Sequence, residues 1–226
     1  MAVAEYRIRR SPRARRVRVT VDPDGTVTVT LPRRAPERAA ADAVQELAPW
    51  IARRRRTLAR AAAEVARPVG TVPYLGETLR LLPQPGRERV HRRGDALLVP
   101  HGDPRAALER FYRRAARAEI APRLDAATAR AGSRYAGLTI RGQRTRWASC
   151  SSEGRMSFNW RLLLAPAEIL DYVVEHEVCH LEVRDHSPRF WALLESRVPG
   201  WREPAAWLRR YGSTLVLPES ARRSAA

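Results

Sequence analysis

Two histidines four residues apart, with a glutamate directly after the first, constrain the fold of this chain more than any other feature of its sequence. His176, Glu177 and His180 form the arrangement H-E-x-x-H. In an α-helix four residues turn through about 400°, so both imidazoles project from one face and can reach the same metal ion. Glu177 lies about 100° round the helix from His176, where it can contact a metal-bound water without being a ligand. The segment is therefore predicted to be a helix that carries a metal site, rather than a helix with two ordinary histidines.

A third metal ligand is expected close to this helix. Catalytic zinc sites usually have three protein ligands and leave the fourth position to water. His186 follows His180 and directly precedes Ser187 and Pro188, a typical helix start, so a short turn can bring it back toward the metal. We therefore predict one Zn²⁺ ion bound by His176, His180 and His186. The alternative ligands are carboxylates: Glu182, Asp185 and Glu195.

The rest of the chain alternates between short strand patterns and longer helical patterns. Valines alternate on both sides of a Pro23-Asp24-Gly25 turn, which predicts a β-hairpin within residues 6–31. Proline and glycine bound the remaining elements. The predicted helices are residues 36–65, residues 103–131, one from Pro166 that carries the H-E-x-x-H motif and one from Pro188. The predicted strands are residues 78–82, 96–99, 138–149 and 156–164.

The charge of the chain is strongly positive and unevenly distributed. The formal net charge is +18, and all 42 basic residues are arginine. Residues 1–70 contain 16 arginines against 7 acidic residues, a net charge of +9. A basic segment of this kind attracts polyanions such as nucleic acid, ribosomes or anionic lipid. We therefore expect nucleic acid or another polyanion as a partner of the N-terminal half, with a solvated charged face as the alternative.

Cysteine content and hydropathy indicate a reducing compartment and no membrane span. Cys150 and Cys179 are the only two cysteines, too few for the disulfide framework of a small secreted domain. The first residues contain Glu5 and several arginines where a signal peptide needs an apolar stretch. No apolar run approaches the roughly 18 residues that a membrane-spanning helix requires. We expect a cytoplasmic protein.

Four short motifs together resemble those of a known family. They are Trp147–Cys150, Asn159–Leu162, His176–Leu181 and Asp185–Ser187, the last followed by Phe190 and Trp191. In these segments the chain resembles the YgjP-like metal-dependent hydrolases, which are related to the SprT-like and WLM-type zincins. The resemblance is specific over residues 138–195 and extends to the N-terminal hairpin and the helix with Trp50 and Ile51. It departs from the family pattern at Ala148, where glycine is usual, and at Val178-Cys179, where Leu-Ala is commoner.

The resemblance implies an α+β fold. We expect a zincin-like catalytic domain, in which a small sheet packs on the metal-binding helix, preceded by an N-terminal subdomain of a β-hairpin and a helix. The expected division is a β-rich subdomain with one long helix over residues 1–102, the metal-dependent hydrolase domain over residues 103–217 and a disordered tail over residues 218–226.

The function implied is that of a zinc-dependent hydrolase, and more narrowly a metallopeptidase that acts on a peptide or protein. Glu177 is the expected catalytic residue, because it can take a proton from the metal-bound water. The segment from Ser149 to Asn159 is the candidate strand for binding substrate backbone. Tyr172, Arg146 and Arg161 are candidate oxyanion donors. The candidate substrate-binding residues are Arg146, Ser149, Asn159 and Arg161.

Two other functions compete with peptide hydrolysis. The same metal could hydrolyse a nucleotide or another phosphoanhydride, with Arg144, Arg146 and Arg161 binding phosphate. Alternatively, the chain binds nucleic acid and its metal site is structural. A structural zinc needs a fourth protein ligand, and Cys150 is the residue that could supply it.

Overall fold

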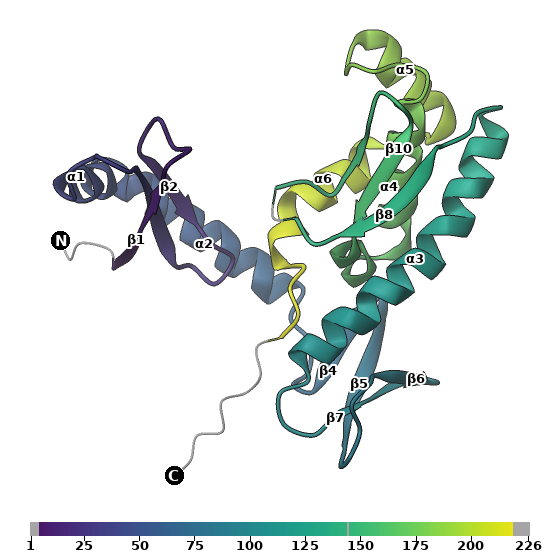
Figure 1. Cartoon of the computed structure of the whole chain (residues 1–226), viewed down its shortest axis with the longest axis horizontal. Helices are drawn as coiled ribbons and strands as arrows, with labels where there is room; N and C mark the ends of the chain where they lie inside the picture. Colours follow the sequence, from purple (N-terminus) through teal and green to yellow (C-terminus); the bar gives the residue numbers. More distant parts are fainter. Residues whose placement is uncertain (1–4, 144, 219–226) are drawn as a thin grey trace. The chain divides into compact units, whose positions relative to one another are not determined.

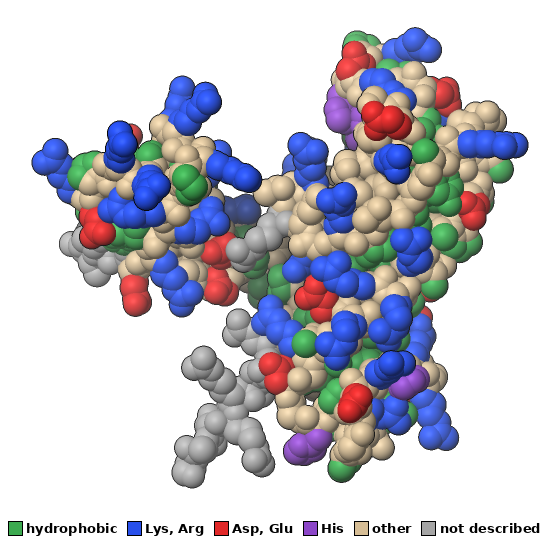
Figure 2. Space-filling view, viewed as in Figure 1, with side chains coloured by type: hydrophobic (Ala, Val, Ile, Leu, Met, Phe, Trp, Pro, Cys, Tyr) green, Lys and Arg blue, Asp and Glu red, His purple; other side chains and the backbone are tan. Residues whose placement is uncertain are grey.

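The computed structural model describes residues 5–143 and 145–218. The chain divides into two compact units (Figure 1). The first contains the residues up to Ala66 together with Arg210–Thr214, and the second contains Arg67–Arg209 together with the residues from Leu215 onward. Each unit has its own hydrophobic core. On the face shown in Figure 2, arginine side chains are spread over both units.

A three-stranded sheet packed on two helices forms the first unit. Its strands are β1 (Tyr6–Ser11), β2 (Arg18–Val21) and β3 (Val27–Pro32), in the order β1-β3-β2, and its helices are α1 (Arg38–Glu46) and α2 (Ala48–Glu64). β2 and β3 pair antiparallel, which confirms the predicted hairpin, and β1 pairs parallel with β3. Because side chains alternate along a strand, Val27, Val29 and Leu31 share one face and are fully buried against the helices.

The single helix predicted over residues 36–65 was wrong, because Pro49 interrupts it. Proline has no backbone N–H to donate to the carbonyl four residues earlier, so it is unfavourable inside a helix and favoured in a first turn. Leu47 separates the two helices, and Pro49 lies in the first turn of α2, where a missing N–H costs nothing. The apolar spacing continues across the break through Val44 and Ile51, so spacing alone suggested one element.

The second unit contains two small sheets and four α-helices among its described residues. One sheet has the order β4-β5-β7-β6, and the other has the order β8-β10-β9. The strands of the first sheet are β4 (Thr71–Tyr74), β5 (Glu77–Gln84), β6 (His91–Arg93) and β7 (Ala96–Pro100). Those of the second are β8 (Gly137–Arg141), β9 (Ala148–Cys150) and β10 (Arg155–Asn159). The helices are α3 (Arg105–Arg130), α4 (Ala167–Cys179), α5 (Pro188–Arg197) and α6 (Arg202–Tyr211), and a short 3₁₀ turn, η1 (Trp160–Leu164), follows β10. The last two residues of α6 and the 3₁₀ turn η2 (Gly212–Thr214) belong to the first unit.

The long helix α3 joins the parts of the second unit. Its buried residues recur at every fourth position along one face, where Leu108, Tyr112, Ala116, Ile120 and Leu124 are almost completely excluded from solvent. This spacing makes a continuous apolar stripe. The stripe packs against β7 at one end and against β8, η1 and α4 further along (Figure 1). The sheet β4-β5-β7-β6 and the sheet β8-β10-β9 therefore belong to one compact unit.

The predicted helix over residues 103–131 is confirmed as α3, and the helices predicted from Pro166 and Pro188 are confirmed as α4 and α5. The strand predicted over residues 138–149 is wrong, since the segment forms β8 and β9, which both pair with β10. The strand predicted over residues 156–164 ends at Asn159, whose side-chain oxygen accepts a hydrogen bond from Arg161 N (3.2 Å) and so caps η1.

Four strands and helices were not predicted, namely β1, β4, β6 and α6. The sequence does contain a helical pattern for α6, because Ala205 and Leu208 are three residues apart and both pack against the core. The domain boundary after residue 102 stays a prediction, although the compact units divide after Ala66. The predicted disordered tail lies outside the described residues, apart from Pro218.

Among the described residues, no helix is both long enough and apolar enough to cross a bilayer.

Truncation of the α3 stripe should destabilise the second unit. We expect Leu124→Ala, at a fully buried position, to lower the free energy of unfolding by about 2–5 kcal/mol, since it leaves a cavity in the core. Leu82→Ala, at a position that is 37% exposed, should cost about 0.5 kcal/mol or less. Urea denaturation of both variants measures the difference, and equal costs would mean that α3 does not form the core described here.

Candidate active site

Three histidine side chains converge at the end of α4. One ring nitrogen from each of His176, His180 and His186 lies within 4.8 Å of the other two. The Nε2 atoms of His176 and His186 are 3.1 Å apart. Two imidazole nitrogens bound to one tetrahedral zinc at its usual bond length would be about 3.3 Å apart. The arrangement therefore fits a single small metal ion.

The packing of α4 fixes the positions of His176 and His180. Its residues Ile169, Leu170, Val173, Val174 and Val178 are buried, so the helix is apolar on most of its surface and packs against α3, β9 and α5. The helix ends at Cys179, and Val183 N donates to Cys179 O (2.9 Å), which closes the last turn. His176 and His180 thus lie one turn apart at the C-terminal end of a helix that is held on several sides.

A short turn brings the third histidine to the other two. Asp185 accepts a hydrogen bond from Ser187 N through its Oδ1 atom (3.2 Å), and α5 begins directly afterwards at Pro188. This side-chain to backbone bond is the usual way in which aspartate stabilises a tight turn. His186 is exposed in this turn, yet its Nε2 atom faces the ring of His176.

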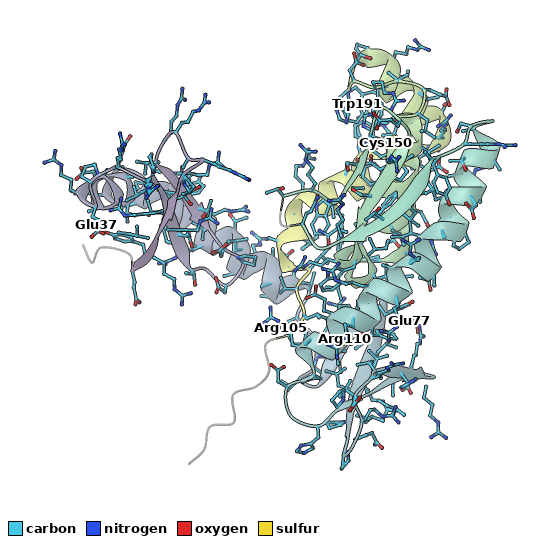
Figure 3. The ribbon with its side chains drawn as sticks, viewed as in Figure 1. Glu37, Glu77, Arg105, Arg110, Cys150 and Trp191 are labelled. Carbon is cyan, nitrogen blue, oxygen red and sulfur yellow. The ribbon has the colours of Figure 1, made fainter. Side chains whose placement is uncertain are left out.

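Aromatic rings of α5 enclose the three imidazoles. The ring of Phe190, which is fully buried, has its centroid 4.6 Å from that of His180, 4.8 Å from that of His186 and 4.9 Å from that of His176. Trp191, labelled in Figure 3, stacks on His186 with the ring planes 28° apart. Rings packed in this way limit the orientations that the imidazoles can adopt.

The stack continues from Trp191 away from the histidines. Trp201 lies parallel to Trp191, with centroids 4.5 Å apart and planes 15° apart. The guanidinium of Arg202 then covers Trp201 at 4.9 Å from the ring centroid. Four groups, His186, Trp191, Trp201 and Arg202, form one continuous stack.

Hydrogen bonding and burial favour neutral, metal-binding imidazoles. His180 donates from Nδ1 to the carbonyl of Val183 (3.0 Å), which leaves Nε2 with its lone pair for a metal. Burial, followed by the neighbouring rings of His180 and His186, lowers the pKa of His176 to about 3. Burial also lowers the pKa of His180. Neutral imidazole is the form that binds metal ions.

Glu177 is a buried carboxylate with one oxygen unused by the protein. Its side chain is only 6% exposed, and it accepts a hydrogen bond from the backbone N–H of Cys150. Burial raises the pKa of Glu177 to about 7, although the bond from Cys150 acts in the opposite direction. Within the described residues, Oε2 of Glu177 and Nδ1 of His176 are buried without a hydrogen-bond partner. The unused Oε2 of Glu177 is the kind of orphaned polar atom expected beside a metal-bound water, whereas Nδ1 of His176 is on the side of the ring away from Nε2.

The strand β9 forms the edge of its sheet beside α4. In the antiparallel pair, Trp147 O accepts from Asn159 N (2.7 Å) and Ser151 N donates to Arg155 O (2.9 Å), and Ser149 lies opposite Ser157. Alternate residues of such a pair direct their backbone groups to the partner strand. The backbone of Ser149 therefore faces β10, whereas the N–H and C=O of Ala148 and Cys150 face the open edge.

The candidate substrate-binding residues have different environments. Ser149 Oγ is 2.8 Å from Ser157 Oγ on β10, and Arg146 is exposed. Asn159 is buried, and its amide nitrogen donates to the carbonyls of Gln143 (2.6 Å) and Arg146 (3.3 Å). The guanidinium of Arg161 covers the ring of Trp160 at 4.6 Å. Asn159 and Arg161 therefore make contacts that hold the loop and η1, and Ser149 lies on the strand beside the histidines. Arg144 lies outside the described residues.

The alternative ligands do not join the histidines. Glu182 pairs with Arg197, Asp185 binds the amide of Ser187, and Glu195 pairs with Arg202 (3.1 Å). Cys150 is also outside the cluster, and its Sγ lies 3.8 Å from Arg184 Nη1. Among the described residues, no fourth protein ligand closes the site. Tyr172, a candidate oxyanion donor, is buried on α4 with its ring 5.9 Å from that of His176.

Several residues that support the site were not identified from the sequence. Arg184 donates to the carbonyls of Ser151 (2.6 Å) and Ser152 (2.8 Å), which fixes the β9–β10 turn to the segment after α4. Phe190 and Trp191 were recognised as part of a motif, without their position around the imidazoles. Trp201 was not singled out, since its contact with Trp191 depends on the turn between α5 and α6.

The geometry described above is that of a metal-dependent hydrolase, and a comparison with known families narrows the class to a peptidase. Residues 15–211 match the family described as YgjP-like, metallopeptidase domain, and the chain belongs to this family. Membership supports a divalent metal and a peptide or protein substrate, and it gives no support to phosphoanhydride hydrolysis or nucleic-acid binding.

Comparisons with solved structures and with curated proteins give less information than the family match. The crystal structure of the metallopeptidase zymogen of Pyrococcus abyssi abylysin is similar to 42% of this chain and 94% of that chain, with 25% sequence identity and a TM-score of 0.37. No curated protein matches the chain.

Loss of the Trp201 ring should weaken metal binding through His186. We expect Trp201→Ala to lower the affinity for a divalent metal by about 10-fold, the effect typical of residues that orient a ligand from behind. Competition with a chelating dye measures the affinity, and the absorption spectrum of the Co²⁺-loaded protein reports a change in coordination. Trp201→Phe keeps a stacked ring and should restore both. Equal losses in the two variants would contradict the role of the stack.

Proposed function

We propose that this chain is a zinc-dependent peptidase in which His176, His180 and His186 hold one Zn²⁺ ion and Glu177 is the general base. The observation that carries the proposal is the convergence of three imidazole nitrogens without a fourth protein ligand among the described residues. Three protein ligands and an open position are typical of catalytic zinc, whereas structural zinc has four protein ligands. When bound, zinc supplies a Lewis acid that polarises the scissile carbonyl and brings the pKa of a water toward about 7.

The surroundings of Glu177 support its proposed role in proton transfer. Its carboxylate is held by the N–H of Cys150, and Oε2 has no hydrogen-bond partner in the described part of the chain. In the proposed mechanism Oε2 accepts a proton from the attacking water and later donates it to the nitrogen of the departing amine. Because Glu177 adjoins His176 on the same helix, it reaches the reacting atoms without occupying a ligand position.

The open edge of β9 is the proposed substrate-binding strand. An extended peptide can add to a sheet edge through main-chain hydrogen bonds, independently of its sequence. The outward N–H and C=O of Ala148 can pair with such a peptide, and the outward N–H of Cys150 is bonded to Glu177. This hydrogen bond links the substrate strand directly to the general base. The N–H of Cys150 thereby fixes the distance between the bound peptide and Glu177.

Substitution of the general base should separate catalysis from metal binding. We expect Glu177→Gln to reduce cleavage of casein or a fluorogenic peptide by at least about 100-fold, since the amide cannot accept the proton but still accepts the bond from Cys150. Zinc content, measured by plasma emission spectroscopy, should stay at one ion per chain. A variant that loses zinc together with activity would show that Glu177 is a ligand instead.

Removal of the third histidine should reduce the zinc content itself. We expect His186→Ala to lose most of its zinc during dialysis, because only two ligands remain on α4. His101→Ala is the matched control, as His101 is exposed and lies outside the histidine cluster. Full zinc occupancy in His186→Ala would refute the proposed ligand set.

Loss of one outward N–H on β9 should weaken substrate binding. Proline is tolerated on an edge strand where its missing N–H faces solvent, so Ala148→Pro should fold and keep its zinc. We expect kcat/KM for a fluorogenic peptide to fall by about 10-fold, the effect of one lost hydrogen bond of roughly 1.4 kcal/mol. Ala148→Ser keeps the N–H and should cleave normally. Unchanged cleavage by the proline variant would exclude β9 as the substrate strand.

A further inference from the structure

We propose that the solvent-facing side of the β1-β3-β2 sheet in the first unit binds the phosphodiester backbone of a nucleic acid. The proposal is independent of the metal site, which lies in the second unit. Net charge alone indicates only that the N-terminal half attracts polyanions, whereas the sheet provides a defined surface.

Strand alternation separates two faces of this sheet. Val27, Val29 and Leu31 of β3 face the helices together with Tyr6 and with Val19 and Val21 of β2. The alternate positions must then face the other way. The strand register places them in two rows across the sheet, one formed by Arg7, Thr28 and Thr20 and the other by Arg9, Thr30 and Arg18. We call these six residues the arginine–threonine face.

The arginines of this face are exposed and partly pre-oriented. Arg7, Arg9 and Arg18 are all exposed. Arg9 Nη2 donates to the hydroxyl of Thr30 (3.2 Å), which ties one guanidinium to the sheet. None of the six residues is acidic. Carboxylates occur at the margin, where Asp22 accepts from the hydroxyl of Thr28 (3.1 Å). In the same turn the backbone N–H of Thr26 lowers the pKa of Asp24, with a smaller contribution from the charge of Arg7.

The chemistry of the face fits phosphate better than other anionic partners. Guanidinium groups bind phosphate oxygens through two parallel hydrogen bonds, so the three exposed arginines would supply the contacts. The threonines hold the surface together instead, since Thr20 donates to the carbonyl of Thr28 (3.1 Å) and Thr30 is only 6% exposed. The six positions carry no apolar side chain that could enter a bilayer, so lipid headgroups are a poorer match. They carry no aromatic ring on which a base could stack. Binding should therefore depend on the backbone of the nucleic acid rather than on its sequence.

Arginines elsewhere in the first unit provide a matched comparison. Arg53, Arg54 and Arg56 of α2 are exposed as well, but they lie on a helix and not on the sheet. Arginines point in several directions from this unit in Figure 2. Equal changes of charge on the two surfaces therefore distinguish a defined binding face from attraction by net charge alone.

The experiment measures the salt dependence of binding to fluorescently labelled 20-base-pair DNA and to the single strand of the same sequence. The proteins are the full chain, the triple variant Arg7→Gln/Arg9→Gln/Arg18→Gln and the triple variant Arg53→Gln/Arg54→Gln/Arg56→Gln. Each phosphate contact contributes about 0.9 to the slope of log K against log salt for a duplex and about 0.7 for a single strand. We expect the sheet variant to lose about 2–3 from this slope and the α2 variant to retain it.

The two oligonucleotides and a vesicle control decide between sources of phosphate. For each oligonucleotide, the slope lost in the sheet variant is divided by the slope per phosphate contact, and the form that loses more contacts is the one that fits the face. Peptidase activity and thermal unfolding of the sheet variant should match those of the original chain, since the face lies outside the metal-binding unit. Equal losses in both triple variants would overturn the proposal, as would binding to phosphatidylserine vesicles in the absence of binding to either oligonucleotide.

Discussion

The burial of α4 is the constraint on which the site depends. A surface helix needs one apolar stripe, but α4 is buried by α3, β9 and α5 and is apolar on most sides. Its histidines and Glu177 are therefore polar groups held where water is scarce, which lowers the pKa of His176 and raises that of Glu177. A cation at the three ring nitrogens would compensate for this desolvation.

The remaining parts of the site are arranged around this helix by three other segments. The turn after α4 positions His186, α5 supplies Phe190 and Trp191, and β9 supplies the N–H that binds Glu177. Arg184 connects two of these segments, because it lies in the turn after α4 and binds carbonyls of the β9–β10 turn. The three histidines, Glu177 and the edge strand β9 are thereby held together by hydrogen bonds and ring contacts.

Local sequence signals, such as helix starts and apolar spacing, were sufficient to predict most of the long helices. The errors occurred where such a signal was overlooked or fitted two structures equally well. The α3 helix was found because Asp103 and Pro104 mark its start and Gly132 follows its end. The break before α2 was missed although Pro49 marks it, since apolar spacing was weighed above the lost N–H. The end of β10 was missed because a continuous apolar run, Leu162 to Leu164, suits a strand and a 3₁₀ turn equally. In the second unit, the pairing of strands was the hardest feature to predict, because β8 and β9 are separate strands that both pair with β10.

The sequence by itself determined the two histidines and the glutamate of α4, because helical periodicity alone brings positions 176 and 180 to one face. It also indicated His186, through the helix start that follows. Only the tertiary structure decided that Trp201 stacks on Trp191, that Cys150 contributes its backbone N–H to Glu177, and that Asn159 holds a loop. The physical reason is that periodicity acts over a few residues, whereas ring stacking and sheet register join residues whose proximity depends on how separate elements pack.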